Sequence, residues 1–313
     1  MRILVASTAF PDTPTLLREL LPDDEVIVDA RTADGTVDVV VPLMTRVDGP
    51  LMDRLQPRLI QQAGVGLEGV DRDAARERGI PVANVPAAGT GNSDAVGEIA
   101  VLHLLALSRR YHDGLVALAD GRLGEPAGVA LGGRTVVILG LGDVGRATAR
   151  RLSGFGARLV GVGTREAASA DALVRELGLD DYVPIGRLTE MLRDAHALIV
   201  CCVLNDATRG LVGAEQLAAL GEGDPGYVVN VARGPIVDYD ALLAALRQGT
   251  IAGAGLEVFW EEPIDPADPL LAENVTLTPH TGGTTTYANR RIAEGVVANV
   301  ERLRRGEQVI EAH

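Results

Sequence analysis

Short apolar runs alternate with segments of helical periodicity along the first third of the chain. The runs have the length and composition of buried strands, and the segments between them, such as 15–21 and 71–78, carry helical patterns. Strands that alternate with helices in this way are typical of a parallel α/β sheet. The predicted strands are Arg2–Ser7, Glu25–Asp29, Val37–Leu43, Arg58–Gln62 and Pro81–Val85.

A long helix over 93–110 separates this series from a second one. Asn92 or Ser93 can cap the helix, and its apolar residues recur at helical spacing. A second series of strands and helices follows, and a final helix over 284–304 ends before Gly306. The strands predicted in the second series are 134–139, 158–162, 197–203, 227–231, 251–256 and 275–278.

The final helix is too isolated to form a domain alone, which indicates that the second series is inserted into the first. We therefore expect an α/β fold with two doubly wound parallel-sheet domains and a cleft between them. One domain comprises residues 1–97 and 286–313, and the other comprises residues 98–285.

The composition narrows the class of protein. Hydrophobic residues make up 47% and charged residues 23% of the chain, which is typical of a globular protein. A net charge of −14 disfavours nucleic acid and anionic membranes as partners, and no segment approaches the length of a membrane span. All 29 basic residues are arginine, which excludes Schiff-base catalysis and a phosphate-binding lysine.

The two cysteines, Cys201 and Cys202, are neighbours in the apolar run 197–204, which predicts a buried strand. With no further cysteine, a disulfide framework is excluded and a zinc site lacks ligands, so we expect no metal site and a reducing compartment, the cytoplasm. The apolar run at the N-terminus is short, and an opening strand explains it better than a signal peptide.

The segment Gly140-Leu141-Gly142-Asp143-Val144-Gly145 matches the pattern G-x-G-x-x-G. It directly follows a predicted strand and opens a helix over 146–155, the setting in which such glycines allow a tight turn and close approach to a pyrophosphate. Free amides at the start of the helix favour the anion. A glycine-rich turn without a ligand is the alternative. The predicted cofactor-binding residues here are Gly140, Gly142, Asp143, Val144 and Gly145.

The end of the next strand bears on the choice of cofactor. An acidic residue that would bind the ribose 2′-hydroxyl is missing, and Gly163-Thr164-Arg165 follows the strand instead. Thr164 can donate a hydrogen bond and Arg165 can pair with a 2′-phosphate, which favours NADP(H), with NAD(H) still possible. The alternative is that Arg165 is a surface residue paired with Glu166.

Three later segments place polar residues at strand ends, where α/β sheets bind ligands. The first is Val229-Asn230-Val231-Ala232-Arg233-Gly234-Pro235. The second is Gly255-Leu256-Glu257-Val258-Phe259-Trp260-Glu261-Glu262-Pro263. The third is Leu277-Thr278-Pro279-His280-Thr281-Gly282-Gly283.

Together with the glycine motif, these segments resemble the D-isomer-specific 2-hydroxyacid dehydrogenase family, over essentially the whole chain and including the segment 62–71. The resemblance implies a flavodoxin-like substrate domain with an inserted Rossmann dinucleotide-binding domain. It also implies hydride transfer between NAD(P)H and a small 2-oxo or 2-hydroxy acid. By the same resemblance, Arg233 binds the substrate carboxylate and carbonyl, His280 is the acid/base, and Glu262 orients His280.

The chemistry of these side chains agrees with the implied roles. Reduction of a 2-oxo acid needs a cation for the carboxylate and a proton donor for the carbonyl oxygen, while the cofactor supplies the hydride. Arg233 offers a planar fork, and His280 can donate near neutral pH, with Glu262 favouring its charged form. The alternatives are that His280 only satisfies its loop, or that Glu261 replaces Glu262. Of the other histidines, His103 is predicted to pack in the long helix, and His112, His196 and His313 lack a motif.

The resemblance extends to further residues. The loop at Val65 and Gly66 would offer backbone amides to the carboxylate, and Met44, in the loop 41–46, would face the substrate. Val203, Val231 and Glu257 complete the predicted cofactor-binding set. Members of the family usually carry aspartate at the position of Glu257. We expect this difference to affect the pH optimum of the activity.

The loop 41–46 limits the range of expected substrates. Phosphoglycerate dehydrogenases of the family look arginine-rich where this chain has Pro42, Leu43 and Met44. This favours glyoxylate, hydroxypyruvate or a related 2-oxo acid. A dinucleotide-sensing corepressor-like protein and a phosphoglycerate dehydrogenase remain the alternatives. The resemblance also implies a homodimer to which the helix 93–110 contributes.

Overall fold

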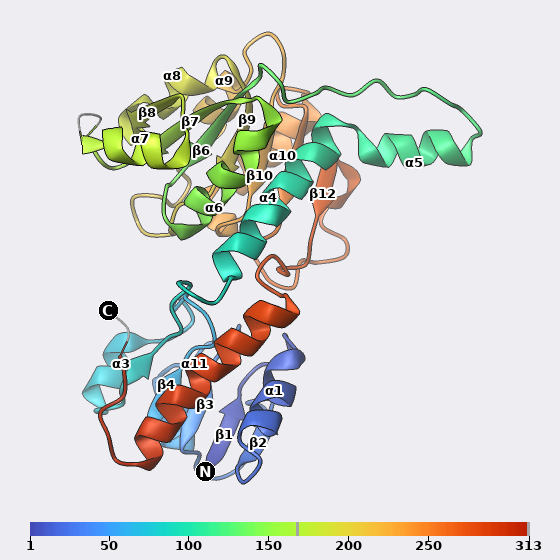
Figure 1. The fold of residues 1–313 in the computed structure, drawn as a ribbon. Helices are drawn as coiled ribbons and strands as arrows, with labels where there is room; N and C mark the ends of the chain where they lie inside the picture. Colours follow the sequence, from blue (N-terminus) through green and yellow to red (C-terminus); the bar gives the residue numbers. More distant parts are fainter. Residues whose placement is uncertain (167–168, 312–313) are drawn as a thin grey trace. The chain divides into compact units, whose positions relative to one another are not determined.

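The computed structural model describes residues 1–166 and 169–311, and His313 therefore lies outside the described residues (Figure 1). The chain divides into two compact units. The first unit comprises Met1–Asn92 and the described residues from Thr284 onward, and the second comprises Ser93–Gly283. Each unit contains one sheet whose strands are all parallel, which confirms the predicted α/β fold with two parallel-sheet domains.

The sheet of the first unit has the strand order β2-β1-β3-β4-β5, as in flavodoxin-like folds. Its central strands are runs of valine, isoleucine and leucine because both faces are covered. Side chains alternate between two hydrophobic clusters, with Ile3 and Val5 on one face and Leu4 on the other. The strands are β1 Arg2–Val5, β2 Glu25–Val28, β3 Val39–Val41, β4 Leu59–Gln61 and β5 Val82–Ala83, and the helices are α1 Asp12–Leu20, α2 Gly49–Leu55, α3 Arg72–Glu77 and α11 Thr286–Arg304.

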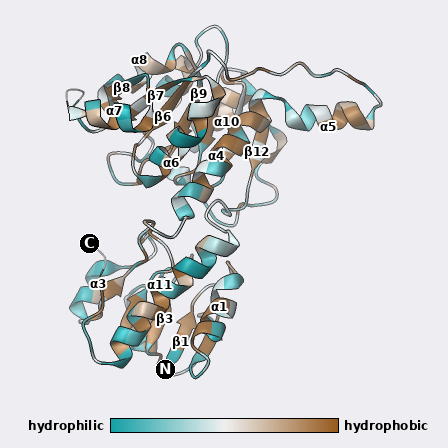
Figure 2. Cartoon of the chain, in the orientation of Figure 1, coloured by the Kyte–Doolittle hydropathy of each residue, from teal (hydrophilic) through white to brown (hydrophobic). Residues whose placement is uncertain are grey.

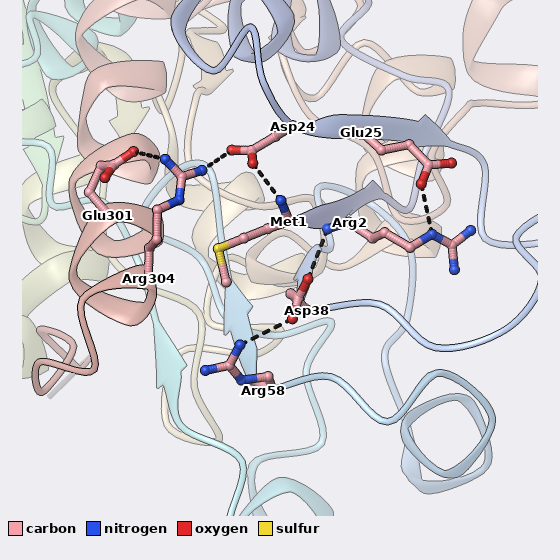
Figure 3. Close-up of polar contacts among 8 residues, drawn as sticks. All are labelled: Met1, Arg2, Asp24, Glu25, Asp38, Arg58, Glu301 and Arg304. Carbon is pink, nitrogen blue, oxygen red and sulfur yellow. Dashed lines mark hydrogen bonds and ion pairs between the residues drawn. The ribbon is translucent and has the colours of Figure 1, made fainter.

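Helix α11 belongs to this first unit although more than two hundred residues separate it from β5. Its buried residues, among them Val296 and Val300, join the cluster of Ile3 and Val5. A polar contact adds to this packing: Asp24 accepts a hydrogen bond from the N-terminal ammonium of Met1 at 2.5 Å and also pairs with Arg304 of α11 (Figure 3). The N-terminus and the last residue of α11 are thus attached to the same carboxylate.

The sheet of the second unit has the order β12-β11-β10-β9-β6-β7-β8, the order of a Rossmann fold with one added strand. The hydrophobic strands of both sheets stand out in Figure 2. The strands are β6 Thr135–Leu139, β7 Arg158–Gly163, β8 Asp181–Pro184, β9 Ala195–Val200, β10 Tyr227–Asn230, β11 Gly253–Leu256 and β12 Val275–Leu277. The helices are α4 Asn92–Ser108, α5 Tyr111–Ala119, α6 Asp143–Leu152, α7 Asp171–Leu177, α8 Leu188–Leu192, α9 Ala214–Ala219 and α10 Tyr239–Arg247.

The order of the strands reverses between β6 and β9: β7 and β8 lie on one side of β6, and β9 to β12 lie on the other. Open α/β sheets bind ligands at such a switch point, outside the carboxyl ends of the strands. Since all the strands are parallel, the loops that follow β6, β7, β9, β10, β11 and β12 all emerge at this one edge.

Two local predictions were wrong in their bounds. Strand β9 ends at Val200, so Cys201 and Cys202 follow the strand instead of lying in it, although the Cys201 amide still donates to the Leu139 carbonyl at 2.8 Å. Helix α6 begins at Asp143, three residues earlier than predicted, because Gly142 already serves as its N-cap. None of the described helices has the length and apolarity required to cross a bilayer.

Candidate active site

The candidate residues of the second unit follow one another along the carboxyl edge of its sheet. His280 lies beyond β12, Glu257 and Glu262 lie beyond β11, and Arg233 lies beyond β10. Val203 follows β9, the glycine motif follows β6, and Thr164 and Arg165 follow β7. Since adjacent strands are about 4.8 Å apart, neighbouring loops bring their side chains within reach of one another.

Arg233 is held by Asn230, a residue that the sequence analysis did not single out. The Asn230 side chain is fully buried at the end of β10, where its amide nitrogen donates to the Arg233 carbonyl at 2.9 Å. Its amide oxygen accepts from the Ala232 nitrogen at 3.1 Å. The turn after β10 is thereby fixed, with Arg233 in an extended conformation at the start of a short 3-10 turn, Gly234–Ile236.

The loop of Arg233 packs directly against the loop of Glu262. A side chain at Gly234 would place its Cβ 2.3 Å from the Phe259 backbone, so only glycine allows this approach. The Trp260 indole donates to the Val237 carbonyl at 2.8 Å and adds a second link. The two loops are therefore fixed relative to each other. The positive charge of Arg233 is one of the contacts that lower the pKa of Glu262.

Glu262 and His280 form the central pair. The Nδ1 atom of His280 lies 2.5 Å from Oε2 of Glu262, and Oε1 accepts from the Phe259 amide at 2.9 Å. Burial raises the pKa of Glu262, but its contacts with His280, the Phe259 amide and Arg233 outweigh burial and hold the pKa below its usual value. Glu261, the alternative, is exposed.

The backbone of His280 adopts φ 54°, a left-handed conformation that is uncommon for residues other than glycine. Its amide donates to the carbonyls of Glu257 at 3.1 Å and Thr278 at 3.0 Å. The Glu257 side chain, which is only 2% exposed, accepts hydrogen bonds from the Thr278 hydroxyl and the Gly282 amide. Burial raises the pKa of Glu257 despite these hydrogen bonds.

The glycine motif makes the turn between β6 and α6. Gly140 has φ 92°, and a Cβ there would lie 2.6 Å from the Cys202 backbone. A Cβ on Gly145 would lie 1.9 Å from the Gly140 carbonyl oxygen, whereas a Cβ on Gly142 would meet nothing within 4 Å. Gly140 and Gly145 are thus required by packing, while Gly142 faces open space at the first turn of the helix. Asp143 is exposed and Val144 is half-buried.

Thr164 and Arg165 are exposed beyond the end of β7. The Tyr182 hydroxyl of β8 accepts from the Arg165 amide at 2.9 Å and donates to the Arg165 carbonyl at 3.1 Å. This double contact fixes the backbone of Arg165, and the described residues show no ion pair between Arg165 and Glu166. The sequence analysis did not single out Tyr182.

Val203 and Val231 differ in accessibility. Val203 is 74% exposed, and Val231 is 5% exposed, with its amide 3.3 Å from the Val200 carbonyl. Burial raises the pKa of the nearby Cys201 and Cys202 thiols to about 12 and about 11, so neither is a nucleophile at neutral pH. Across residues 1–166 and 169–311, no group of three or more potential metal ligands occurs.

The three predicted substrate-binding residues lie in the first unit. Met44 follows β3, and Val65 and Gly66 follow β4. Gln62 joins these two loops, because its side chain accepts from the Leu43 amide at 3.0 Å and donates to the carbonyls of Leu43 at 3.1 Å and Gly66 at 2.9 Å. Met44 and Val65 are exposed.

Comparison with known proteins identifies the family. Residues 101–282 match the profile of the D-isomer specific 2-hydroxyacid dehydrogenase NAD binding domain. The chain is 34% identical to a glyoxylate reductase of Korarchaeum cryptofilum over 298 residues, 92% of this chain and 85% of that protein.

Two solved structures have the same fold. One is a D-lactate dehydrogenase from Escherichia coli, with a TM-score of 0.83 and 26% identity over 99% of both chains. The other is an NADPH-dependent glyoxylate/hydroxypyruvate reductase from Sinorhizobium meliloti in complex with NADP and malonate. Its TM-score is 0.77 and its identity 31%, over 99% of this chain and 95% of that one. The chain therefore belongs to the D-isomer-specific 2-hydroxyacid dehydrogenase family and is an oxidoreductase that uses a nicotinamide dinucleotide.

Proposed function

We propose that the protein reduces a small 2-oxo acid of the glyoxylate or hydroxypyruvate type, with Arg233, Glu262 and His280 as its catalytic residues. The observation that carries this proposal is the contact of 2.5 Å between His280 Nδ1 and Glu262 Oε2 at the carboxyl edge of the sheet, beside the loop of Arg233. A guanidinium, an imidazole and a carboxylate from three neighbouring loops are the groups that this reduction requires.

Each of the three residues has a distinct role in the proposal. Arg233 binds the substrate carboxylate and draws electron density toward the carbonyl oxygen. His280 delivers a proton from Nε2 to that oxygen, since Nδ1 is directed at Glu262. Glu262 fixes the ring orientation and stabilises the charged imidazole, because its lowered pKa keeps the carboxylate ionised at neutral pH.

The residues of the glycine motif fit a dinucleotide. The space at Gly142, where an added Cβ meets nothing within 4 Å, lets a pyrophosphate approach the backbone amides at the start of α6. Asp143, Val144, Val203 and Val231 complete the proposed binding surface. When bound, the cofactor supplies the hydride. Glu257 supports this surface from beneath, through its hydrogen bonds with the loop of His280.

We propose NADP(H) as the preferred cofactor. A carboxylate at the end of β7 would repel a 2′-phosphate, and this chain has Gly163, Thr164 and Arg165 there instead. Tyr182 fixes the Arg165 backbone through two hydrogen bonds. The exposed guanidinium can therefore bind a 2′-phosphate from a fixed turn. The similar reductase of Sinorhizobium meliloti was solved with NADP.

Substrate selection is assigned to two loops of the first unit, those that follow β3 and β4. Val65 and Gly66 offer backbone amides to the substrate carboxylate, and Met44 contributes an apolar side chain. Gln62 holds both loops together. The apolar residues Pro42, Leu43 and Met44 favour a small unphosphorylated acid over 3-phosphoglycerate.

The decisive experiment measures oxidation of NADPH and NADH with a panel of 2-oxo acids. We expect turnover of glyoxylate or hydroxypyruvate, little with phosphorylated acids, and a loss of about 10³-fold in kcat for His280→Ala with dinucleotide affinity retained. Tight dinucleotide binding without turnover of any 2-oxo acid would instead favour a dinucleotide-sensing protein. Near-normal kcat in His280→Ala would remove His280 from the mechanism.

We further propose a homodimer in the cytoplasm. Helix α5 extends away from the sheet of its own unit (Figure 1), and nine residues are too few for a helix to be stable in water without packing. A second copy of the chain would cover its apolar side chains, and light scattering that gives the mass of a monomer would refute this. Two half-buried cysteines that form no disulfide suit a reducing compartment. The exposed apolar residues of α4, α5 and the following segment are Leu102, Tyr111, Leu115, Val116, Leu118 and Leu123.

A further inference from the structure

A buried chain of polar side chains lies beneath the loop that carries His280. It begins at His103 of α4, which is 2% exposed and packs against the end of the sheet. Gly255 of β11 makes room for it, because a Cβ there would lie 2.6 Å from the Cβ of His103. The two ring nitrogens of His103 contact two threonine hydroxyls, Thr276 at 2.8 Å and Thr278 at 2.9 Å.

The direction of these hydrogen bonds follows from the chemistry of the groups. The Thr278 hydroxyl has one proton, which it donates to the Glu257 carboxylate, so toward His103 it acts as an acceptor. Nε2 of His103 therefore carries the proton, and Nδ1 accepts from the Thr276 hydroxyl. Burial lowers the pKa of His103 to about 4, so the ring is neutral at neutral pH and has only this one N–H.

Glu257 connects these buried polar side chains to the loop of His280. It contacts every second residue of that loop, at positions 278, 280 and 282. Its carboxylate accepts from the Thr278 hydroxyl and the Gly282 amide, and its backbone carbonyl accepts from the His280 amide at 3.1 Å. The residue held in the middle, His280, is the one with φ 54°. A left-handed conformation of a residue other than glycine persists only where the surroundings enforce it.

We propose that His103, Thr278 and Glu257 are positioning residues that hold the loop 278–282 so that the His280 imidazole stays against Glu262. His103 and Glu257 are buried and Thr278 is half-buried, so little solvent reaches the hydrogen bonds that join them. The inference rests on the proposed role of His280, and it assigns a function to a histidine that sequence alone suggests is only packing.

The length of Glu257 matters in this arrangement. Its carboxylate spans two donors that lie four residues apart, and a Cβ on Gly282 would already lie 2.8 Å from Oε1. A glutamine at this position has one acceptor oxygen and an amide that cannot accept from a second donor. Glu257→Gln therefore loses one of the two attachments of the loop while the volume of the side chain is kept.

The test compares Thr278→Val with Thr278→Ser. Valine keeps the volume and removes the hydroxyl, which leaves the His103 N–H without an acceptor and Glu257 with one donor fewer. Serine restores the hydroxyl. The matched control is Ser108→Ala, because the Ser108 hydroxyl at the C-terminal end of α4 contacts His196 Nε2 at 3.0 Å and makes no hydrogen bond to the loop.

For each variant kcat, KM, dinucleotide affinity and Tm are measured, with His280→Ala as the reference. We expect Thr278→Val to lower kcat by about tenfold or more with dinucleotide affinity within about twofold, and Thr278→Ser to recover most of kcat. Ser108→Ala should lower Tm by a similar amount to Thr278→Val and leave kcat unchanged. Nitrogen-15 spectra should show the His103 proton on Nε2.

Two results would overturn the inference. One is a kcat within about twofold of the unmodified protein in Thr278→Val, together with a fall in Tm like that of Ser108→Ala. The other is equal loss of kcat in the valine and serine variants. Either result with an inactive His280→Ala protein contradicts only the positioning role, whereas an active His280→Ala protein contradicts the proposed function itself.

Discussion

At the scale of single residues, Glu262 shows how a buried carboxylate can remain charged. Burial alone raises its pKa, but the hydrogen bond with His280, the Phe259 amide and the charge of Arg233 lower the pKa below its usual value. A carboxyl group whose folded pKa is lowered contributes stability above its unfolded pKa, and this contribution is lost as the pH falls through the folded value. At neutral pH the negative charge beside His280 is therefore maintained.

The prediction for this pair is that Glu262→Gln lowers kcat by about tenfold or more and moves the high-pH limb of the reduction rate to lower pH. Glutamine removes the negative charge that stabilises the protonated imidazole, so His280 loses its proton more readily. The profile of kcat against pH measures this. Glu261→Gln, one residue earlier and exposed, is the control and should behave like the unmodified protein. An unshifted limb in Glu262→Gln would argue against electrostatic support of His280.

A second prediction concerns Arg165. Arg165→Ala should raise KM for NADPH by about tenfold or more, the effect of losing a hydrogen bond to a charged group, and should leave KM for NADH within about twofold. NADH is the internal control because it lacks the 2′-phosphate. Equal losses with both cofactors would indicate that Arg165 does not contact the phosphate and that the preference for NADP(H) has another origin.

The sequence predicted those residues whose chemistry is conspicuous at a strand end, as for Arg233, Glu262 and His280. It did not single out Asn230 or Thr278, because short polar residues at the end of a buried strand are also common for purely structural reasons. His103 was assigned to packing for a similar reason: its two hydrogen-bond partners lie more than 170 residues away in the chain. The spacing of Thr276 in β12 and Thr278 just after its end, two residues apart as for side chains on one face of a strand, is the one local pattern that could have pointed to it.

At the scale of elements, the glycine motif combines two physical requirements in six residues. Gly145 permits close packing of α6 on its own turn, since a Cβ would approach the Gly140 oxygen to 1.9 Å. Gly142 has open space around it, and the proposed pyrophosphate is what requires glycine there. The sequence pattern treats both glycines alike, and only the structure separates their roles.

This separation gives a prediction with two matched variants. Gly145→Ala should lower Tm by more than about 5 °C, because backbone must shift to admit the methyl group. Gly142→Ala should leave Tm near that of the unmodified protein and weaken dinucleotide binding by about tenfold or more, since the methyl group fills the space beside the helix amides. Calorimetry and a binding titration measure the two effects. Unchanged binding in Gly142→Ala would contradict the placement of the pyrophosphate at this turn.

Long elements with a strong periodic pattern were predicted well, and short ones were not. Most strands of the two sheets are continuous apolar runs because both faces of a parallel sheet are covered, and such runs are visible in sequence. The edge strand β8 was missed because its four residues include Asp181 and Pro184. The strand predicted over 197–203 extends too far, because apolar residues continue beyond Val200, the last residue of β9 that pairs with β6 and β10.

At the scale of the whole molecule, segments that are far apart in the sequence belong to the same unit. The first unit is discontinuous, and α11 completes its core through Val296 and Val300 and pairs with Asp24 through Arg304. The isolation of the final helix in sequence predicted the insertion of one domain into another. Where one unit ends and the other begins was harder to predict, because the junction near residue 92 falls at the start of the long helix α4.

Because each unit has its own sheet with a hydrophobic cluster on both faces, we expect two unfolding transitions in calorimetry. A ligand that binds only the folded form of one unit stabilises that unit alone. NADPH at about 100 times its Kd adds about 2.7 kcal/mol to the unfolding free energy of the unit it binds, so one transition should move to higher temperature and the other should not. In Gly142→Ala at the same NADPH concentration, a tenfold weaker affinity leaves about 1.4 kcal/mol of stabilisation, so the same transition should move only about half as far. A single transition that shifts as a whole would mean that the two units unfold together, despite their separate cores.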